Sequence, residues 1–337
     1  MFNNNILVTG TGGCGVGEGI FKSLTELQDY NVFTCNSSDN SLFVFDNPER
    51  SFIVPKAGSV NYFKVLIEIC KEHQIGVIVP GSEQELVVFV NQREHFTAQG
   101  ITIFANTSEV IEVFDNKWET FLKLNQLGIN TPDTCLDGQD ASSFFERNQY
   151  PIIIKPVYGN ASKNVFILNN TEEYNCISQY LRLKKIQFVI QEYIGTSEEE
   201  FTISVLTDFN GNYLGSIVLK RILAGGFSQF IECEEFNELD NAAIKIAEQI
   251  HSKGPLNIQC RLYNGKLSVF EINPRFSGTT PFRTLLGFNE FDVLFKKTFE
   301  GVNIFKREKL KSQSFGVRGF QEKVYEKKIK TTIRTYQ

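Results

Sequence analysis

The chain has 337 residues, 42% hydrophobic and 22% charged, so it can bury more than one core, and its length predicts two or three domains. Seven cysteines form no C-x-x-C pair, which predicts reduced, buried thiols and a cytoplasmic protein. No stretch of about 18 apolar residues occurs, and no basic region precedes the apolar run 6–8. We therefore expect neither a membrane span nor an export signal.

Short β-type runs alternate with helical patterns in the first hundred residues. The predicted strands are 6–9, 31–35, 77–80 and 102–105, and the predicted helices are 16–28, 62–73 and 83–95. Strands that alternate with helices form parallel sheets covered on both faces. The pattern predicts a doubly wound, Rossmann-like domain.

A glycine-rich run, GTGGCG at 10–15, follows the first predicted strand and opens a helix. Backbone amides at such a turn can hold an anionic group, so one interpretation is an NAD(P)-dependent oxidoreductase. The dinucleotide fingerprint also needs an acidic residue about 20 positions on, and Asp39 comes several residues too late. The alternative is that these glycines only permit a tight turn and close packing.

The pattern changes near residue 110. A helix is predicted at 116–127, ending at Gly128, and another at 239–252. The predicted strands are 151–156, 165–168, 188–193, 201–207, 213–218, 256–262 and 267–272. Asn210-Gly211 and Asn264-Gly265 are hairpin turns between neighbouring strands. The second part is therefore expected to be an α+β region with antiparallel sheets.

Oxygen-bearing side chains gather on the last predicted hairpin. Glu271 and Asn273 lie two residues apart and should share a strand face with Val269, while Gln259 should lie across the turn. Carboxylate and amide oxygens suit Mg²⁺, or Mn²⁺ in its place. Arg275 follows and could stabilise charge on a transferred phosphoryl group. The structural alternative is an ordinary amphipathic hairpin.

Residues suited to a nucleotide precede that hairpin. Lys155 ends a buried strand beside the small-residue loop 159–163, where a cation and free amides could bind phosphates. Glu192 stands where a strand turns into a loop whose backbone could read an adenine edge. Glu200 opens the next strand, where its carboxylate could bind ribose hydroxyls. Each feature alone also fits a solvated surface charge.

A lysine, a small-residue loop, an acidic strand end, a second glutamate and a metal-binding hairpin thus follow one another along the chain. In this order of features the sequence resembles the ATP-grasp superfamily over roughly 1–305, most closely its members similar to the large subunit of carbamoyl phosphate synthase. The resemblance implies that 1–108 form a pre-ATP-grasp domain, which would explain the glycine turn without NAD. It implies an ATP-grasp domain at 109–305, with a nucleotide-binding subdomain at about 150–195 and a metal-binding subdomain at about 196–305. The basic segment 306–337, with an alternating apolar pattern around Phe315 and Val317, is predicted to contain a strand and to pack back on that domain.

The resemblance also implies site residues by position. Catalytic roles fall on Arg275, Lys155 and Arg221, and metal-binding roles on Gln259, Glu271 and Asn273. The implied nucleotide-binding residues are Lys117, Lys155, Gly159, Ser162, Glu192, Ile194, Glu200 and Lys220. Glu83 and Glu85 resemble an acidic pair that the first domain brings to the cleft.

The implied activity is an ATP- and Mg²⁺-dependent ligase. It would phosphorylate a carboxylate and join the acyl phosphate to an amine, releasing ADP and phosphate. Alternatives are phosphorylation of carbamate or bicarbonate, the NAD(P) oxidoreductase, and a sensor that binds ATP without turnover. Small molecules are the expected partners, without nucleic acid or membrane, and a homodimer is the usual expectation for such a protein.

Overall fold

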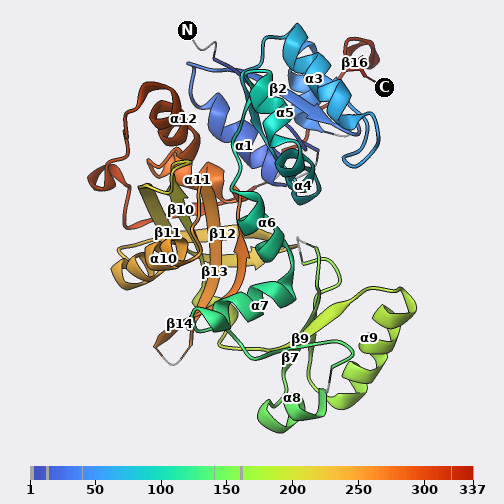
Figure 1. Ribbon diagram of the computed structural model, residues 1–337, viewed down its shortest axis with the longest axis vertical. Coiled ribbons are helices and arrows are strands. Elements are labelled where there is room, and N and C mark those ends of the chain that lie inside the picture. Colours follow the sequence, from blue (N-terminus) through green and yellow to red (C-terminus); the bar gives the residue numbers. More distant parts are fainter. Residues whose placement is uncertain are drawn as a thin grey trace.

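The computed structural model describes residues 4–12, 15–39, 41–139, 141–159, 162–263, 265–319 and 321–336. Parts of three predicted motifs lie outside the described residues: Gly13 and Cys14 of the glycine turn, Asn160 and Ala161 of the phosphate loop, and Asn264 of the last hairpin turn. Figure 1 shows an N-terminal domain at the top, a large antiparallel sheet in the middle and a smaller lobe at the bottom.

The N-terminal domain is built on a parallel sheet, sheet A. Its strands are β1 (Asn5–Val8), β2 (Asn31–Asn36), β3 (Ser51–Ile53), β4 (Val77–Val79), β5 (Thr102–Ile103) and β16 (Arg334–Thr335). They pair in the order β16-β3-β2-β1-β4-β5. The helices of this domain are α1 (Val16–Thr25), α2 (Leu42–Asp46), α3 (Tyr62–Glu72), α4 (Glu83–Asn91) and α5 (Arg93–Ala98). The predicted doubly wound arrangement is confirmed.

The glycine turn is closely packed against its own neighbours. Gly10 has a φ of +60°, a conformation that glycine adopts without strain. A Cβ at Gly17 would lie 2.3 Å from the Gly10 carbonyl oxygen, and one at Gly81 would lie 2.1 Å from the Thr9 carbonyl oxygen. The buried side chain of Glu85 lies against Gly10, and its carboxyl group occupies space beside the turn. These contacts agree with the packing interpretation of the glycines.

The large sheet, sheet C, is antiparallel and carries most of the predicted site. Its strands are β10 (Glu200–Thr207), β11 (Tyr213–Ala224), β12 (Phe227–Cys233), β13 (Pro255–Tyr263), β14 (Lys266–Asn273) and β15 (Ser314–Val317), in the order β14-β13-β10-β11-β12-β15. Helix α10 (Asn237–Gln249) packs on one face. Helices α11 (Thr280–Leu285) and α12 (Glu290–Glu300) share a core with α1 and the opposite face, which joins the sheet to the N-terminal domain.

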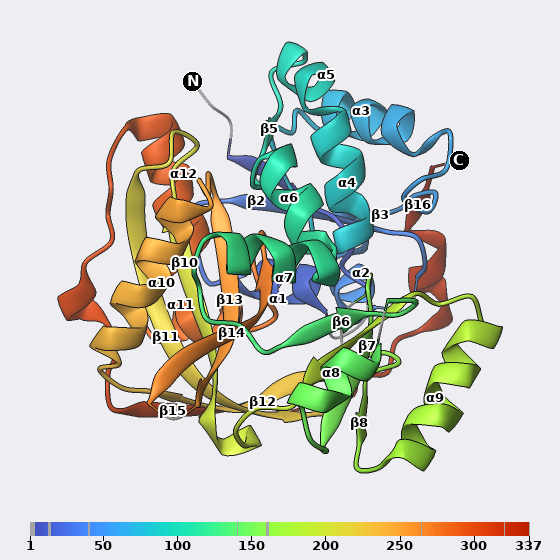
Figure 2. The same ribbon diagram turned by 60° about the horizontal axis from the view of Figure 1, so that its bottom comes forward.

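The smaller lobe has its own sheet and its own hydrophobic core. Sheet B contains β6 (Thr134–Leu136), β7 (Ile152–Pro156), β8 (Phe166–Leu168) and β9 (Phe188–Glu192), in the antiparallel order β6-β9-β7-β8, with helices α8 (Ala141–Arg147) and α9 (Thr171–Leu183). Helices α6 (Ser108–Asp115) and α7 (Lys117–Gln126) lead into it from the N-terminal domain. Figure 2, in which the lobe comes forward, shows α7 running between the lobe and the rest of the molecule.

The C-terminal segment returns to both large sheets. Strand β15 pairs with β12 at the edge of sheet C, and β16 pairs with β3 at the edge of sheet A. Between them, Lys323 and Tyr325 contact Asp46 of the N-terminal domain. The segment thus spans two domains rather than only one. Short 3-10 turns at Pro48–Arg50, Ser197–Glu199, Arg307–Lys309 and Lys327–Thr331 complete the structure.

Several boundaries differ from the predicted ones. The predicted helix 83–95 is divided into α4 and α5 at Gln92. Strand β11 continues past residue 218 to Ala224, and β3 and β12 had no counterpart among the predicted strands. Strand β3 is only three residues long, so it offers too few positions for an alternating pattern. Within the described residues, no helix is both long enough and apolar enough to cross a bilayer.

Candidate functional site

The metal-binding candidates are neighbours on one face of sheet C. The register places Gln259 of β13 directly opposite Glu271 of β14, and Asn257 opposite Asn273. Directly opposed residues in an antiparallel pair have Cβ atoms about 4.5–5.5 Å apart, so these side chains can meet. The predicted cross-strand position of Gln259 is confirmed.

A β-bulge changes the face assignment of one residue. Val269 pairs with Cys260 while Glu271 pairs with Gln259, so residue 270 is an extra residue in β14. An extra residue reverses the alternation of side chains beyond it. Val269 consequently lies in the hydrophobic core with Ile272, and the prediction that it shares the face of Glu271 is wrong.

Arg221 lies on the same face of sheet C. It forms hydrogen bonds with Glu200, the predicted ribose-binding residue, and with Gln259, a predicted metal-binding residue. Its Nη2 donates to Gln259 Oε1 at 2.7 Å and to Glu200 Oε1 at 2.7 Å. The other oxygen of Glu200 accepts from Arg261 Nη2 at 2.8 Å. Both carboxylate oxygens of this buried glutamate are therefore paired with guanidinium groups.

Arg261 is a site residue that the sequence predictions missed. Its Nη1 donates to the carbonyl oxygen of Ile194 at 2.8 Å, and its guanidinium lies 4.8 Å from the ring centroid of Tyr193. It thus connects the segment predicted to read adenine with Glu200. The available signal was the period of two along β13, which places Asn257, Gln259 and Arg261 on one face.

Lys155 lies between the two antiparallel sheets. Its side chain is buried, and its Nζ donates to the carbonyl oxygen of Phe270 at 3.2 Å. Burial, together with the nearby Lys117 ammonium, lowers the pKa of Lys155 to about 8, and the Glu271 carboxylate opposes that shift. A buried ammonium of this kind is suited to an anionic partner, because phosphate charge would offset its desolvation.

Lys117 begins helix α7 and bridges two predicted elements. Its Nζ donates to the carbonyl oxygen of Gly159 at 2.7 Å and lies 3.9 Å from Glu271 Oε1. Asn116 caps the helix by accepting from the backbone amides of the next turn, which fixes the direction in which Lys117 leaves the backbone. Gly159 has a φ of +136°, and Ser162, the other loop residue predicted to bind the nucleotide, is exposed.

Arg275 joins the hairpin to the N-terminal domain. Its Nε donates to Glu83 Oε1 at 2.6 Å, and its Nη2 donates to Asn273 Oδ1 at 3.2 Å. The amide nitrogen of Asn273 is buried and has no hydrogen-bond partner among the described residues. Glu83 is the first residue of α4, whose N-cap Ser82 directs it toward the cleft between the domains.

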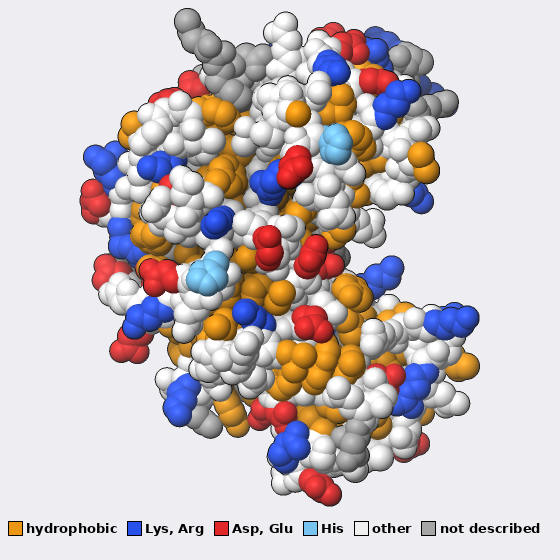
Figure 3. Space-filling view, viewed as in Figure 1, with side chains coloured by type: hydrophobic (Ala, Val, Ile, Leu, Met, Phe, Trp, Pro, Cys, Tyr) orange, Lys and Arg blue, Asp and Glu red, His pale blue; other side chains and the backbone are white. Residues whose placement is uncertain are grey.

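Six of these residues, Glu83, Lys117, Gly159, Glu271, Asn273 and Arg275, line one cleft. Its lining residues are Glu83, Leu86, Ile111, Phe114, Asp115, Lys117, Gly159, Glu271, Asn273, Pro274 and Arg275. Figure 3 shows acidic and basic side chains close together across the middle of the molecule, and a notch between the N-terminal domain and the smaller lobe. Among the described residues, no group of three or more His, Cys, Asp or Glu side chains could hold a metal alone.

Other predicted residues lie apart from this cleft or in different surroundings. Lys220 points to the α10 face of β11, because it pairs with the core residue Phe201, and its Nζ lies 3.7 Å from Glu232. Adjacent residues of a strand face opposite sides, so Lys220 and Arg221 cannot both reach the cluster. Glu192 accepts from the backbone amide of Asp133 at 3.3 Å.

Comparisons with known proteins agree with this arrangement. Residues 114–279 match the model of the ATP-grasp domain, and residues 6–104 match the model of the PylC-like N-terminal domain. The carbamoyl phosphate synthase large chain of Thermoanaerobacter sp. (strain X514) is 26% identical over 302 residues, which cover 82% of this chain and 27% of that protein. The chain therefore spans about a quarter of the length of such relatives.

Solved structures show the same fold. A biotin carboxylase from Campylobacter jejuni, in complex with β,γ-ATP, superposes with a TM-score of 0.69 at 17% identity, covering 93% of this chain and 74% of that one. The biotin carboxylase domain of a 2-oxoglutarate carboxylase from Hydrogenobacter thermophilus, a dimer with MgADP, ADP and bicarbonate, gives 0.68 at 16% identity, covering 94% and 74%. The fold predicted from the sequence is confirmed.

Proposed function

We propose that the chain is an ADP-forming ligase that phosphorylates a small carboxylate with ATP and joins the acyl phosphate to an amine. The match of residues 114–279 to the ATP-grasp domain supports this proposal, as does the likeness to a carbamoyl phosphate synthase large chain and to a biotin carboxylase. One observation carries the proposal. Lys117, Glu271 and Arg275 line one cleft, and the buried ammonium of Lys155 lies close enough to Glu271 for their charges to interact. Cations and a carboxylate arranged in this way suit a metal-bound triphosphate.

The donor set fits Mg²⁺. Glu271, Gln259 and Asn273 offer a carboxylate and two amides, the hard oxygen ligands that this ion takes while sharing its shell with phosphates and water. The amide nitrogen of Asn273 has no hydrogen-bond partner among the described residues, and the amide oxygen accepts only from Arg275 there, so few bonds oppose a rearrangement of this side chain around a ligand. Bound there, Mg²⁺ would neutralise charge on the nucleotide phosphates.

The chain's own residues would supply positioning and charge. Lys117 and Lys155 would hold the phosphates while a carboxylate oxygen of the substrate bonds to the γ-phosphorus, and ADP leaves. Arg275 would stabilise charge on the transferred phosphoryl oxygens. The amine nitrogen then bonds to the acyl carbon, the carbon–oxygen bond to phosphate breaks, and the amine proton leaves with hydrogen phosphate.

A substrate screen tests this reaction class. Amino acids and other small carboxylates, each with and without an amine, are supplied with ATP and Mg²⁺ while ADP release is measured. We expect at least one acid to stimulate ADP release, with an amide as product. The single tryptophan, Trp118, adjoins Lys117 and gives an independent fluorescence signal for nucleotide binding. Absence of nucleotide binding in that titration would contradict the proposal.

Glu271→Gln separates an enzyme from a sensor. The substitution keeps the shape but removes the charge that a metal needs, so we expect ADP release to fall by about 100-fold or more. Nucleotide binding without Mg²⁺, followed through Trp118, should change little. A variant that keeps full turnover would show that Glu271 is not a metal ligand, whereas a wild-type protein that binds ATP without any turnover would be a sensor.

A second candidate acceptor is bicarbonate or carbamate. It is favoured by the likeness to carbamoyl phosphate synthase large chains and to a biotin carboxylase domain bound to bicarbonate. Each of these acceptors also offers a carboxylate oxygen to the γ-phosphorus. Bicarbonate-dependent ADP release in degassed buffer, without any added organic acid, would identify this variant of the reaction.

A further inference from the structure

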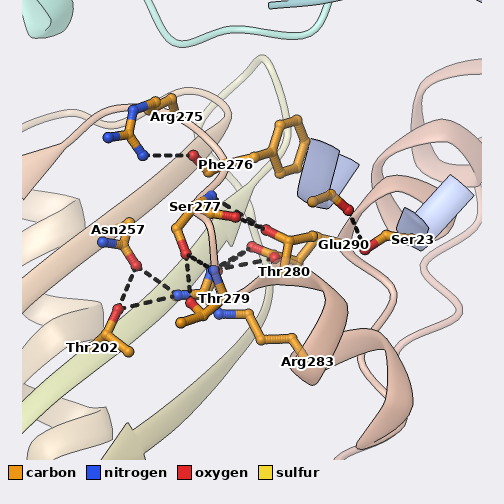
Figure 4. A network of polar contacts seen from close by, with 12 residues as sticks. Ser23, Thr202, Asn257, Arg275, Phe276, Ser277, Thr279, Thr280, Arg283 and Glu290 are labelled. Carbon is orange, nitrogen blue, oxygen red and sulfur yellow. Dashed lines mark hydrogen bonds and ion pairs between the residues drawn. The ribbon is translucent and has the colours of Figure 1, made fainter. Parts of the chain in front are cut away.

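A fully buried ion pair lies behind the hairpin that carries the metal candidates. Arg283 of α11 and Glu290 of α12 both have 0% exposure, and Arg283 Nη1 donates to both carboxylate oxygens of Glu290 at 3.2 Å. Arg283 Nη2 donates to Asn257 Oδ1 at 2.5 Å. Glu290 in turn accepts a hydrogen bond from Ser204. Figure 4 shows Arg283, Asn257 and Thr202 in one network of polar contacts.

The sheet register connects this network to the metal candidates. Asn257 stands directly opposite Asn273 and two residues before Gln259 on the same face of β13. Thr202, which donates to Asn257 at 2.8 Å, lies opposite Gln259 on the other neighbouring strand. The guanidinium of Arg283 therefore contacts side chains in the two rows of the sheet that also hold Gln259, Glu271 and Asn273.

Stability alone is a weak explanation for this network. Removing an arginine and a glutamate from water is costly, and apolar residues of similar volume often stabilise such a position as well or better. Here the cost is increased, because Arg283 Nε is buried without a hydrogen-bond partner among the described residues. A guanidinium does offer donors in a fixed planar geometry, which can hold an amide in one orientation.

We propose that Arg283 and Glu290 are positioning residues that fix β13 relative to β10, its other neighbour in sheet C, and thereby hold Gln259, and through the β13–β14 register Glu271 and Asn273, in the geometry that a divalent cation needs. Arg283 acts through its hydrogen bond to the Asn257 side chain, and the ion pair with Glu290 fixes the position of the Arg283 guanidinium. The inference rests on the proposed function, since it assumes a metal at these three residues. It assigns Arg283 an indirect role, through the side chains of sheet C, and no contact with the metal itself.

The test measures metal affinity and nucleotide affinity separately. Mn²⁺ binding is followed by electron paramagnetic resonance in the presence of ADP, and metal-free ADP binding is followed by Trp118 fluorescence in EDTA. Loss of a group that orients metal ligands typically weakens metal affinity 10–100-fold. For Arg283→Lys we expect Mn²⁺ affinity to fall by about tenfold, while metal-free ADP affinity changes by less than about twofold.

Two further variants test whether Arg283 influences Mn²⁺ affinity through Asn257. Asn257→Ala should weaken Mn²⁺ binding similarly, and combining it with Arg283→Lys should add little, because both remove the same link. Thr34→Val is the matched control, since it removes a buried hydrogen bond to Ser51 in sheet A, outside the sheet that carries the site. It should lower the melting temperature and leave Mn²⁺ affinity unchanged. If Arg283→Lys does not fold, Glu290→Gln supplies the same comparison.

The outcomes are distinct. Unchanged Mn²⁺ affinity in folded Arg283→Lys and Asn257→Ala, with only a lower melting temperature, would mean that the network is purely structural and would overturn the inference. Additive effects of the two substitutions would also overturn it, because Arg283 would then not act through Asn257. Failure of the wild-type protein to bind Mn²⁺ with ADP would instead contradict the proposed function itself.

Discussion

Lys155 shows how one residue's surroundings set its chemistry. It follows three isoleucines on β7, so its ammonium is carried into the space between the two antiparallel sheets instead of into solvent. Its pKa of about 8 lies well below the ordinary value of 10.5. Below pH 8 the folded and unfolded chains both carry this charge. Between about pH 8 and 10.5 the unfolded chain binds more protons, so this residue makes stability rise with pH.

The same pKa predicts a pH dependence of nucleotide binding. Phosphates favour the charged ammonium, so binding must take up a proton above pH 8. We expect the affinity for ATP, measured by Trp118 fluorescence, to fall by up to about tenfold from pH 8 to pH 9. Lys155→Arg keeps its charge throughout this range, and its affinity should stay nearly constant. An equal loss of affinity in both proteins would assign the pH effect to another group.

At the scale of elements, the glycine turn allows close backbone packing, whereas the bulged hairpin sets which face of the sheet each side chain occupies. The turn after β1 brings three backbone segments into contact, so Gly10, Gly17 and Gly81 leave no space for a side chain. The bulge in β14 places the Glu271 side chain on the cleft side while Val269 and Ile272 both remain in the core. Backbone geometry thus decides what each element presents to its surroundings.

Substitution of Gly81 tests the packing explanation. A Cβ there would lie 2.1 Å from the Thr9 carbonyl oxygen, so the backbone would have to move. We expect Gly81→Ala to destabilise the protein by roughly 2–4 kcal/mol in urea unfolding. Gly319→Ala is the matched control, because a Cβ at Gly319 meets nothing within 4 Å. Equal stability of the two variants would contradict the packing explanation.

At the scale of the whole molecule, the C-terminal segment and the cleft both depend on contacts between domains. Arg275 pairs with Glu83 across 192 positions of sequence. The final residues complete the edge of sheet A, where Tyr336 packs edge-to-face on the buried ring of Phe52 with centroids 5.7 Å apart. The domain that supplies Glu83 is therefore also the domain that the end of the chain covers.

Substitution of Tyr336 measures how much the C-terminal residues stabilise the edge of sheet A. Aromatic pairs contribute about 0.5–1.5 kcal/mol beyond the area they bury. We expect Tyr336→Ala to lower the free energy of unfolding by about 1–2 kcal/mol and to increase hydrogen exchange in β3. Val324→Ala, at a fully exposed residue of the same segment, should lie within about 0.5 kcal/mol of the wild type. Wild-type exchange in β3 of the Tyr336 variant would show that β16 does not protect this edge.

Alternation and turn residues in the sequence predicted the doubly wound domain, the antiparallel region and the pairing of Gln259 with Glu271, because these depend on a few neighbouring residues. The same alternation already required Lys220 and Arg221 to face opposite sides of one strand. Only the tertiary structure revealed three other features: the extra residue in β14, the Arg275–Glu83 ion pair and the Arg283–Glu290 ion pair. Each depends on strand register or on the docking of distant segments, and no local pattern of residues encodes either.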